Sequence, residues 1–533
     1  MPRVRTDVLV IGGGATGAGV LRDVAMRGFD ALLVDRADLG EGTTGRYHGL
    51  LHSGARYVVK DPRSAEECIA ENFVLRRIAR DCIEDTGGLF VTTPWDDPAY
   101  ADRFVEACRA TGVPVQEIPP GLALLREPRL NPRISRAFLV PDAAIDAWKT
   151  IWGCVRSAEA YGARALPYHP VVRVLRDDGR VAGAVCRDER SGEEVEIEAS
   201  FTINAAGVWA GRIAELAGCP GVTIVPGKGI MIATSHRAVN TVVNRCDMPG
   251  DGDILVPIRT VSVIGTTDTA VPDPDRLEIT REEVEEMLEA GERLVPGFRE
   301  SRILRVWAGA RPLFKDERAA AGDTRDISRG LALIDHRERD GVDGLVTITG
   351  GKATTFRLMA EVAVDAMCAQ LGEERPCLTA EEELPGSEEG FYLLGSRLET
   401  QERALHDDQL ICECELVPRR RLEAAIERRQ TENLDDLRRV LRLAMGPCQG
   451  GFCIYRATGI LHDARGLDGA RANAALLAFL QERWKGVRPI LFGDQLRQAR
   501  LDDWIFQGLL DVQHLNAAEE ADNADVALAT VEG

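Results

Sequence analysis

Residues 7–17 read DVLVIGGGATG, and this stretch decides the fold of the chain. The aliphatic run before the glycines predicts a strand buried on both faces, and the spaced apolar residues after them predict a helix. Strand, glycine turn and helix in this order are the setting in which Gly12-x-Gly14-x-x-Gly17 acts as a dinucleotide-binding fingerprint. Gly12 permits the tight turn, Gly14 lets the backbone approach a pyrophosphate, and Gly17 lets the helix lie close to the strand.

A second apolar strand, at residues 31–34, ends in the acidic residue Asp35. A carboxylate about 20 residues beyond the glycine turn is the usual partner of a ribose hydroxyl, and the N-terminus of the helix attracts phosphates. The alternative is a glycine-rich turn between a strand and a helix in some other α/β fold. The two strands, the helix and the acid together predict a bound nucleotide. Its contacts at this end of the site are assigned to Gly12, Gly14, Ala15, Thr16, Gly17, Asp35, Arg36, Thr43 and Thr44.

A second strand and glycine turn stand far from the first, where residues 345–348 run into GGKATT at 350–355 and a helical pattern follows. This return predicts one nucleotide domain assembled from distant segments, with a second sheet (strands expected at 224–233, 253–257 and 261–265) laid over it as a cap. The second helix N-terminus favours FAD over NAD, because it can face a flavin ring whose reduced form is anionic. Plain helix capping is the alternative. The cofactor contacts assigned to this half are Ala206, Gly207, Gly351, Lys352, Ala353 and Thr354.

Length and charge limit the possible functions. The 533 residues give room for two to four domains of about 150 residues each. The formal net charge of −20 argues against a general nucleic-acid surface and makes any local cluster of arginines informative. No signal peptide is recognisable, and no run reaches the ~18 apolar residues of a membrane-spanning helix. We therefore expect a cytoplasmic protein that reaches a membrane only through a partner.

Four of the thirteen cysteines form two close pairs, Cys412-x-Cys414 and Cys448-x4-Cys453. Four thiolates at such spacing suit a [2Fe–2S] cluster or a tetrahedral zinc ion, and thiolate softness does not choose between them. Two glycines after Cys448 would let backbone amides approach the sulfurs. A flavin delivers two electrons that a nearby one-electron cluster would pass on singly, which favours iron over zinc.

Several motifs in the expected order resemble the FAD-dependent glycerol-3-phosphate dehydrogenases. They are GGGATGAGVLRDVAMRG (12–28), TTGRYHGLLHSGARY (43–57), NAAGVWA (204–210), IGTTD (264–268), AGARPL (308–313) and TGGKATTFR (349–357). The cysteine pairs and the stretch LQERWKGVRPILFGDQLR (480–497) are similar to the A subunits of the anaerobic, three-subunit form. The resemblance spans nearly the whole chain.

The resemblance implies an α/β (α+β) fold. A glutathione-reductase-like, FAD-binding Rossmann domain would carry an antiparallel-sheet substrate cap. A helical ferredoxin-like [2Fe–2S] domain, similar to the one named after bacterioferritin-associated ferredoxin, would follow. The expected bounds are 1–378 for the dehydrogenase (FAD-binding segments 1–85, 140–215 and 330–375), 379–406 for a linker, 407–465 for the ferredoxin-like domain, 466–515 for a C-terminal packing segment and 516–533 for a disordered tail.

The activity implied by the resemblance is oxidation of sn-glycerol 3-phosphate to dihydroxyacetone phosphate, by hydride transfer from C2 to flavin N5. Electrons would then pass through the iron–sulfur cluster and partner subunits to quinone. The expected partners are a membrane-anchoring iron–sulfur subunit together with a second flavoprotein or catalytic subunit. The chain itself would be peripheral to the inner face of the cell membrane, and whether the partner carries a further flavin stays open.

A phosphorylated substrate needs preplaced cations, preferably arginine forks. By resemblance, these are Arg56, Arg311 and Lys352, which are also assigned to catalysis; each alone could instead form a surface salt bridge. Tyr57 is expected beside them, and Thr267 and Asp268 at a strand end facing the site. The base that takes the hydroxyl proton is not assigned. His52 is the candidate, with a structural histidine as the alternative.

Two other functions remain open from the residues alone. The first is a different FAD oxidoreductase on the same scaffold, acting on an amine or a hydroxy acid, with no need for a phosphate. The second is a non-catalytic flavin and metal protein that transfers electrons or senses redox state.

Overall fold

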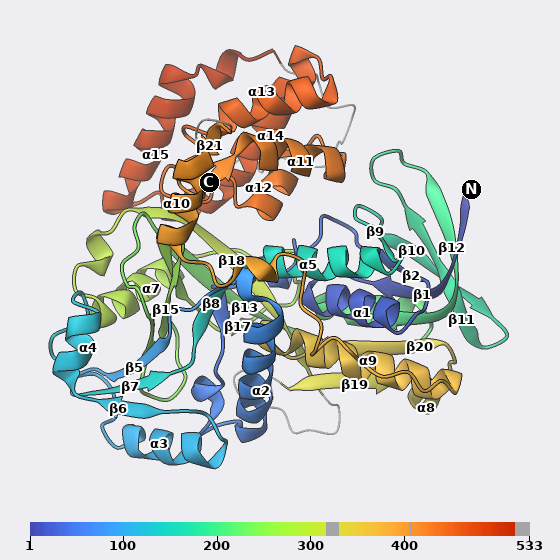
Figure 1. Cartoon of the computed structure of the whole chain (residues 1–533), viewed down its shortest axis with the longest axis horizontal. Coiled ribbons are helices and arrows are strands. Elements are labelled where there is room, and N and C mark those ends of the chain that lie inside the picture. The colour runs from blue at the N-terminus through green and yellow to red at the C-terminus, as the bar shows by residue number, and fades with distance from the viewer. Residues whose placement is uncertain (316–329, 405–407, 517–533) are drawn as a thin grey trace, which may run out of the picture. The chain divides into compact units, whose positions relative to one another are not determined.

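A computed structural model describes residues 1–315, 330–404 and 408–516 (Figure 1). The chain divides into two compact units, residues 1–397 and 398–533. The tail predicted to be disordered lies outside the described residues from position 517 onward.

The first unit is built on an eight-stranded sheet in the order β10-β11-β12-β1-β2-β9, with β20 paired to β12 and β19 to β20. Strands β9, β2, β1, β12 and β20 run parallel, whereas β10, β11 and β19 are antiparallel to their neighbours. The strands are β1 (Arg3–Ile11), β2 (Ala31–Val34), β9 (Arg164–Leu166), β10 (Val171–Asp177), β11 (Arg180–Arg187), β12 (Glu194–Asn204), β19 (Leu331–Asp335) and β20 (Leu345–Gly350). The sheet therefore joins segments that lie far apart in the chain, as the second glycine turn predicts.

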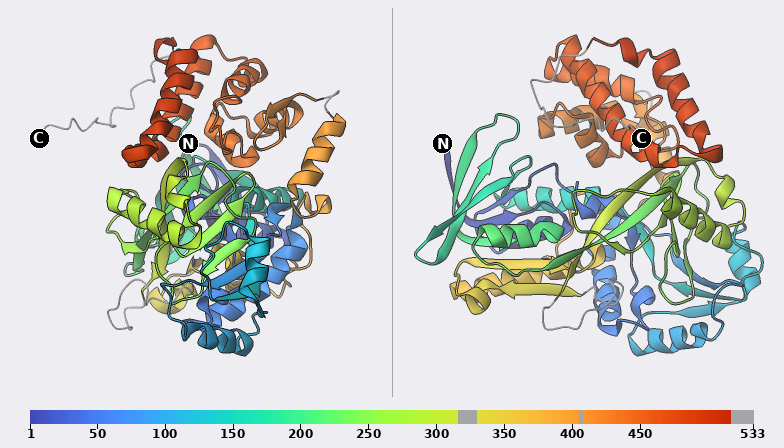
Figure 2. Two further views of the ribbon diagram at one scale, coloured as in Figure 1. Left: turned by 90° about the vertical axis from the view of Figure 1, so that its left-hand side faces the viewer. Right: turned by 180° about the vertical axis from the view of Figure 1, so that it is seen from behind.

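Strand β1 is buried on both faces, which explains its continuous aliphatic run. Val8 and Val10 pack in one apolar cluster with the helices α1 (Ala15–Met26), α5 (Ala147–Ala160) and α9 (Phe356–Leu371). Leu9 and Ile11 pack in another cluster, with β11 and β12. The hairpin of β10 and β11 lies at the edge of the sheet near the N-terminus (Figure 2).

A second, nine-stranded sheet forms the cap, in the order β17-β13-β16-β15-β14-β5-β7-β6 with β18 paired to β13. It is antiparallel except for the pair β14 and β5. Its strands are β5 (Gly88–Thr92), β6 (Gln116–Ile118), β7 (Arg136–Val140), β13 (Ile224–Thr234), β14 (Val242–Arg245), β15 (Ile254–Ile258), β16 (Val261–Gly265), β17 (Thr269–Ala270) and β18 (Ile303–Phe314). The three strands predicted for this sheet are confirmed as β13, β15 and β16.

Short elements complete the first unit. A three-stranded sheet joins β3 (Leu50–Leu51), β8 (Ala143–Ile145) and β4 (Ile83–Glu84). The remaining helices are α2 (Pro62–Ile78), α3 (Tyr100–Ala110), α4 (Pro120–Arg126), α6 (Ala210–Leu216), α7 (Arg281–Leu294) and α8 (His336–Asp340). Helix α7 begins with the capping box of Thr280 and Glu283.

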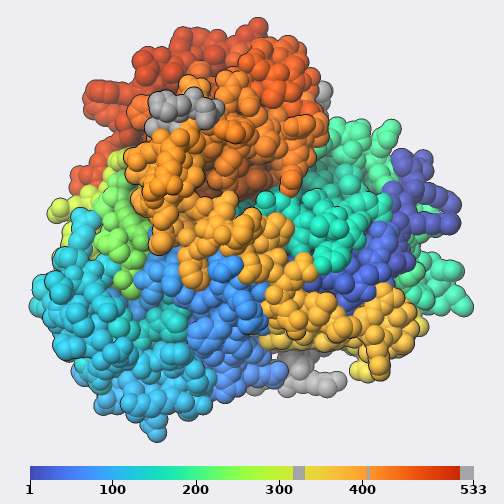
Figure 3. Space-filling model, viewed as in Figure 1, coloured from blue at the N-terminus to red at the C-terminus, as the bar shows by residue number. Residues whose placement is uncertain are grey.

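The stretch expected to be a linker, residues 379–406, differs from that expectation in its first half. Leu384 is 1% exposed, and its N–H donates to the Ile78 carbonyl at 2.7 Å. The buried guanidinium of Arg22 donates to the carbonyls of Thr379 and Glu382. The acidic composition conceals these anchors, and residues 379–397 lie at the surface of the first unit, where Leu384 bonds to the last residue of α2 (Figure 3).

The second unit is mainly helical. It contains a short hairpin, β21 (Leu410–Cys412) and β22 (Val417–Pro418), with helices α11 (Arg419–Arg429), α12 (Leu434–Leu441), α13 (Ile454–Arg465), α14 (Gly469–Val487) and α15 (Leu496–Asp502); α10 (Leu394–Ala404) precedes them. Leu437, Leu461, Phe479 and Phe506 lie in one core with two of the clustered cysteines. Among the described residues, none of the helices is long and apolar enough to cross a membrane.

Candidate functional site

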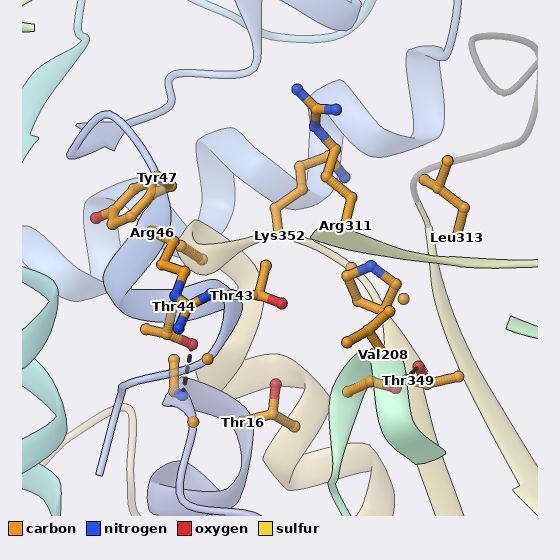
Figure 4. Close-up of a pocket in the computed structure, with 18 of the residues that line it drawn as sticks. Thr16, Thr43, Thr44, Arg46, Tyr47, Val208, Arg311, Leu313, Thr349 and Lys352 are labelled. Carbon is orange, nitrogen blue, oxygen red and sulfur yellow. Dashed lines mark hydrogen bonds between the residues drawn. The ribbon is translucent and has the colours of Figure 1, made fainter. Parts of the chain in front are cut away.

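A cavity of about 950 Å³ opens in the first unit at the carboxyl ends of β1 and β12. The turn after β1, the loop after β2, the end of β18 and the turn after β20 border it. Open α/β sheets bind their ligands at such strand ends. Figure 4 shows Thr16, Thr43 and Thr44 on one wall, with Arg311 and Lys352 extending in the same direction on another.

The glycine turn has the geometry that the fingerprint requires. Gly12 has φ +110°, and an added Cβ would lie 2.6 Å from the carbonyl oxygen of Ala205. A Cβ on Gly17 would lie 1.7 Å from the Gly12 oxygen, so the helix start leaves no room for one. Gly14 instead borders the cavity, and an added Cβ would lie 3.2 Å from the Thr44 hydroxyl. That hydroxyl accepts from the Ala15 N–H at 3.1 Å (Figure 4). A phosphate can therefore approach the backbone here.

Asp35 borders the cavity at the end of β2. Its carboxylate accepts from the N–H groups of Gly13 and Ala37, at 2.5 and 2.9 Å. Burial raises its pKa to about 6 against these two hydrogen bonds, which act in the opposite direction. The next residue, Arg36, lies 4.0 Å from the ring centroid of Trp209.

Every residue assigned to the cofactor borders the cavity except Gly17 and Thr354. Gly17 lies behind the turn. The Thr354 hydroxyl accepts from the backbone N–H of His52 at 3.0 Å and is 2% exposed. Thr354 therefore supports the segment that carries His52 and does not reach into the cavity.

The three cations assigned to the substrate all border the cavity, and protein groups hold the two guanidiniums in fixed directions. Arg311 pairs with Asp268 at 3.1 Å and donates to the Thr267 carbonyl at 2.9 Å and to the Thr266 hydroxyl. Arg56 forms a buried ion pair with Asp253. Such contacts fix the direction of each guanidinium before any ligand arrives.

Lys352 and Tyr57 lie together. The Lys352 ammonium is 5.0 Å from the centroid of the Tyr57 ring, within cation–π range. The Tyr57 ring is in turn 5.3 Å from the His52 ring. The Tyr57 ring is thus a close neighbour of both a cation and the candidate base.

The two residues expected from the end of β16 have other places. Thr267 does not border the cavity, and its hydroxyl accepts from the Ile230 N–H at 3.1 Å. Asp268 does border the cavity, but it is 5% exposed and is paired with Arg311. Its neighbour Thr266, which the sequence analysis does not assign, contributes the hydroxyl next to Arg311.

Two further residues, Arg46 and His48, border the cavity although the sequence does not predict them there. His48 is two residues before Leu50 and four before His52. Gly49, between His48 and Leu50, has φ +80°, so the backbone turns there and the alternation of an extended strand gives no signal for His48. The Leu50 N–H donates to His48 Nδ1 at 3.2 Å, and the His48 and His52 ring centroids are 6.1 Å apart.

The His48 imidazole is kept neutral. Burial, reinforced by the positive charges of Arg311 and Arg56, lowers its pKa to about 3. His48 is therefore uncharged at any pH at which the protein is expected to work.

The four clustered cysteines meet in the second unit. Cys412 ends β21, Cys453 precedes α13, and the Sγ atoms of Cys414 and Cys448 are 3.7 Å apart. Cys453 forms thiol–thiol hydrogen bonds with both Cys412 and Cys448. Cys412 and Cys453 are buried, whereas Cys414 and Cys448 are partly exposed.

Backbone N–H groups point at these sulfurs. Those of Gly450 and Phe452 bond to Cys448, and those of Glu415 and Ala444 bond to Cys412. Gly450 has φ +96°, a conformation that favours glycine. The thiol–thiol hydrogen bonds from Cys414 and Cys453, with these N–H groups, lower the pKa of Cys448. The same thiol–thiol hydrogen bonds raise the pKa of Cys414 and Cys453, so the cluster favours thiolates at Cys412 and Cys448.

Comparison with known proteins agrees with this site. A family model described as FAD dependent oxidoreductase matches residues 7–366. The A subunit of the anaerobic glycerol-3-phosphate dehydrogenase of Escherichia coli K12 is 43% identical over 531 residues, 95% of this chain and 97% of the relative. The Haemophilus influenzae protein of the same name is 41% identical over 537 residues, 97% of this chain and 95% of the relative.

Solved structures agree on the fold. The glycerol-3-phosphate dehydrogenase of Bacillus halodurans, complexed with FAD, has a TM-score of 0.65 at 22% identity and covers 92% of this chain and 97% of its own. Glycine oxidase of Geobacillus kaustophilus has a TM-score of 0.55 at 22% identity over 72% of this chain and 99% of its own. The preference for FAD over NAD and the two-sheet dehydrogenase fold are confirmed, whereas the iron–sulfur domain stays a prediction. The chain belongs to the FAD-dependent oxidoreductases and, within them, to the family of the anaerobic glycerol-3-phosphate dehydrogenase A subunits.

Proposed function

We propose that this chain oxidises sn-glycerol 3-phosphate to dihydroxyacetone phosphate with bound FAD. The observation that carries the proposal is the meeting of Arg56, Arg311 and Lys352 at one cavity beside the glycine turn, in a chain with a net charge of −20. A phosphate monoester carries nearly two negative charges and needs such cations. An amine or hydroxy acid does not need three of them, so the alternative oxidoreductase is not favoured.

The residues present fit FAD. The cavity wall at Gly14 has no Cβ, so the pyrophosphate can reach the helix N-terminus. Asp35 at the end of β2 suits the ribose hydroxyls, and the turn after β20 brings a second helix start to the same cavity, where it would serve the flavin ring. When bound, the flavin supplies the acceptor for the hydride that leaves C2.

The remaining work falls to this chain's side chains. Arg311, Arg56 and Lys352 bind the phosphate and orient the alcohol, with Tyr57 packed against Lys352. His52 is the proposed base that takes the hydroxyl proton, so that the alcohol loses one hydride and one proton and becomes a ketone. Asp268 and Thr266 hold Arg311 in place at the cavity wall.

The cysteine site is proposed to hold a [2Fe–2S] cluster. Four thiolates around zinc would lie about 3.8 Å from one another, given Zn–S bonds of about 2.3 Å. In the part of the chain that the structure describes, no three of the four sulfurs lie within 4.8 Å of one another. The N–H groups aimed at the sulfurs suit the several sulfur acceptors of an iron–sulfur cluster, and a two-electron flavin donor needs a one-electron acceptor, so both support two iron atoms over one zinc.

From the cluster, electrons would pass to the other polypeptides of the complex and then to quinone. The relatives are named as A subunits, which supports further subunits for this chain too. The proposed partners are a membrane-anchoring iron–sulfur subunit together with a second flavoprotein or catalytic subunit. Through them the chain would lie on the inner face of the membrane.

One anaerobic titration tests the function. Adding sn-glycerol 3-phosphate to the oxidised, flavin-loaded protein is expected to bleach the flavin band. Lactate and glycine, added separately, are the controls for the hydroxy-acid and amine alternatives. Bleaching by either of them and not by glycerol 3-phosphate contradicts the proposal, and so does a band that no substrate changes.

Cys448→Ser is expected to remove the visible absorption beyond that of the flavin, because a serine hydroxyl is a poor substitute for a ligating thiolate in the set. Reduction of the flavin by substrate should persist, since the FAD cavity lies entirely in the first unit. The measurement is the absorption spectrum of each purified variant. Cys377→Ser, a partly exposed thiol of the first unit, is the control and should change neither band. An unchanged spectrum in Cys448→Ser would mean that the site holds no iron–sulfur cluster.

A further inference from the structure

His48 is almost enclosed at the cavity wall. It is 8% exposed, and its ring lies 5.8 Å from that of Tyr47 and 6.1 Å from that of His52. On another side, a Cβ on Gly265 would lie 3.1 Å from His48 Cδ2, tighter than an ordinary contact, so the glycine lets the imidazole pack closely against the backbone. The ring is therefore held in one place by its surroundings.

One hydrogen bond sets the tautomer of this ring. The Leu50 N–H donates to Nδ1 at 3.2 Å, so Nδ1 is the acceptor nitrogen and the proton of the neutral imidazole is on Nε2. Within residues 1–315, 330–404 and 408–516, Nε2 has no hydrogen-bond partner. A donor in a cavity wall, in a side chain more than nine-tenths buried, calls for an acceptor from a ligand.

The charges that face His48 oppose its protonation, so the neutral ring keeps its one N–H as a hydrogen-bond donor. Arg311, from β18, and Arg56, from the segment after β3, are the cations whose fields act on it. His52 and Tyr47 are the other titratable groups beside its ring. Neither is an acid that would favour a protonated His48. The ring can donate a hydrogen bond to an oxygen, but it cannot take up a proton as a base.

We infer that His48 Nε2–H donates a hydrogen bond to the substrate hydroxyl oxygen whose proton passes to His52. The inference rests on the proposed function and adds a catalytic residue to it. One oxygen that bonds to both rings needs their two nitrogens no more than about 5.6 Å apart, the length of two hydrogen bonds of about 2.8 Å. The ring centroids are 6.1 Å apart, a separation that allows such a pair of nitrogens. As C2 loses a hydride and the oxygen loses its proton, negative charge develops on that oxygen, and a preplaced donor stabilises it.

Two variants distinguish the roles of the two ring nitrogens of His48. His48→Asn keeps an acceptor near the position of Nδ1 and loses the donor at Nε2. His48→Gln keeps an N–H group near the position of Nε2 and loses the acceptor. We expect kcat for glycerol 3-phosphate to fall about 100-fold in His48→Asn, as when one oxyanion donor is removed, and to stay within about tenfold in His48→Gln.

The pH profile distinguishes a fixed donor from a base. In His48→Asn the acid limb of kcat against pH should stay where it is in the unaltered protein, because His48 does not titrate there. Loss of that limb would make His48 the base and overturn the inference, and so would a kcat within twofold of the unaltered protein. His236→Asn, at a histidine outside the cavity lining, is the control and should keep the full kcat.

A measurement on the unaltered protein does not depend on how the variants fold. ¹⁵N NMR of histidine-labelled, flavin-loaded protein should show a signal for His48, identified by its coupling to the Leu50 amide, with the proton on Nε2 and no titration between pH 5 and pH 8. A proton on Nδ1, or titration in that range, contradicts the inference. If the unaltered protein does not oxidise glycerol 3-phosphate at all, the proposed function fails first, and the NMR result still reports the state of His48.

Discussion

Arg311→Ala is expected to lower kcat/KM for glycerol 3-phosphate by about 1000-fold while the flavin stays bound. Loss of one member of a buried, hydrogen-bonded charge pair costs about 2–5 kcal/mol, because the remaining charge keeps its place without compensation. Here that charge is Asp268, which is 5% exposed and borders the cavity. The variant would therefore lose a phosphate ligand and leave a carboxylate that repels the phosphate.

Two further substitutions test whether this loss is specific to the guanidinium of Arg311. Arg311→Lys should recover only part of the loss, since an ammonium cannot make the paired contacts with Asp268 and the Thr267 carbonyl as a planar fork does. Arg305→Ala, on the same strand but outside the cavity lining, is the matched control. The measurements are steady-state kinetics with a soluble acceptor and the flavin content of each variant. A loss of flavin equal to the loss of activity would show that Arg311 serves the cofactor rather than the substrate.

Gly17→Ala is expected to abolish FAD binding altogether. A Cβ there would lie 1.7 Å from the Gly12 carbonyl oxygen, and a backbone atom cannot move aside as a side-chain end can. The turn and the start of α1 must shift, and the phosphate-binding N–H groups shift with them. Flavin absorbance per protein after purification measures the effect, and thermal unfolding measures the accompanying loss of stability.

Two glycine variants serve as its controls. Gly14→Ala places a Cβ at the cavity wall, 3.2 Å from the Thr44 hydroxyl, so it should weaken FAD binding without lowering the stability of the flavin-free protein. Gly121→Ala in α4 meets no atom within 4 Å and should leave both properties unchanged or slightly raise stability, since alanine favours helix. Full flavin content in Gly17→Ala would rule out the role given to this turn.

The nucleotide half of the site follows from the sequence because its requirements are local. A turn with positive φ at Gly12 and no room for a Cβ at Gly17 can be recognised from eleven consecutive residues. The convergence of Arg56 and Arg311 could not be derived in this way. Their partners Asp253 and Asp268 lie far away or on another strand, and only the family resemblance indicated that they meet.

The sequence pattern alone cannot decide which of two adjacent residues faces the cavity. Thr266 and Thr267 follow the same strand, and the sequence gives no means of deciding which hydroxyl faces the cavity. Side chains alternate between the two faces of a strand, so an error of one position reverses the assignment. His48 could not be predicted for a related reason. Its role depends on which of its two ring nitrogens accepts the hydrogen bond from the Leu50 N–H.

The prediction that residues 379–406 form a linker is inaccurate in its first half for a different reason. Its composition indicates solvent exposure, yet Leu384 is buried and Arg22 donates to two of its carbonyls across more than 350 positions of the chain. Acidic residues at the surface of a segment do not exclude anchors between them. Nothing at Arg22 itself indicates that its partners lie so far along the chain.

The order of strands in the first sheet also affects how the protein is made. Strand β1 needs β12, which needs β20, and α1 is covered by α9. At about 5–20 residues per second, a ribosome releases residue 371 some 20–75 seconds after the first strand emerges. During that interval the aliphatic side chains of β1 are not yet buried by the later segments. A nascent chain truncated before α9 should therefore bind chaperones and should not bind FAD.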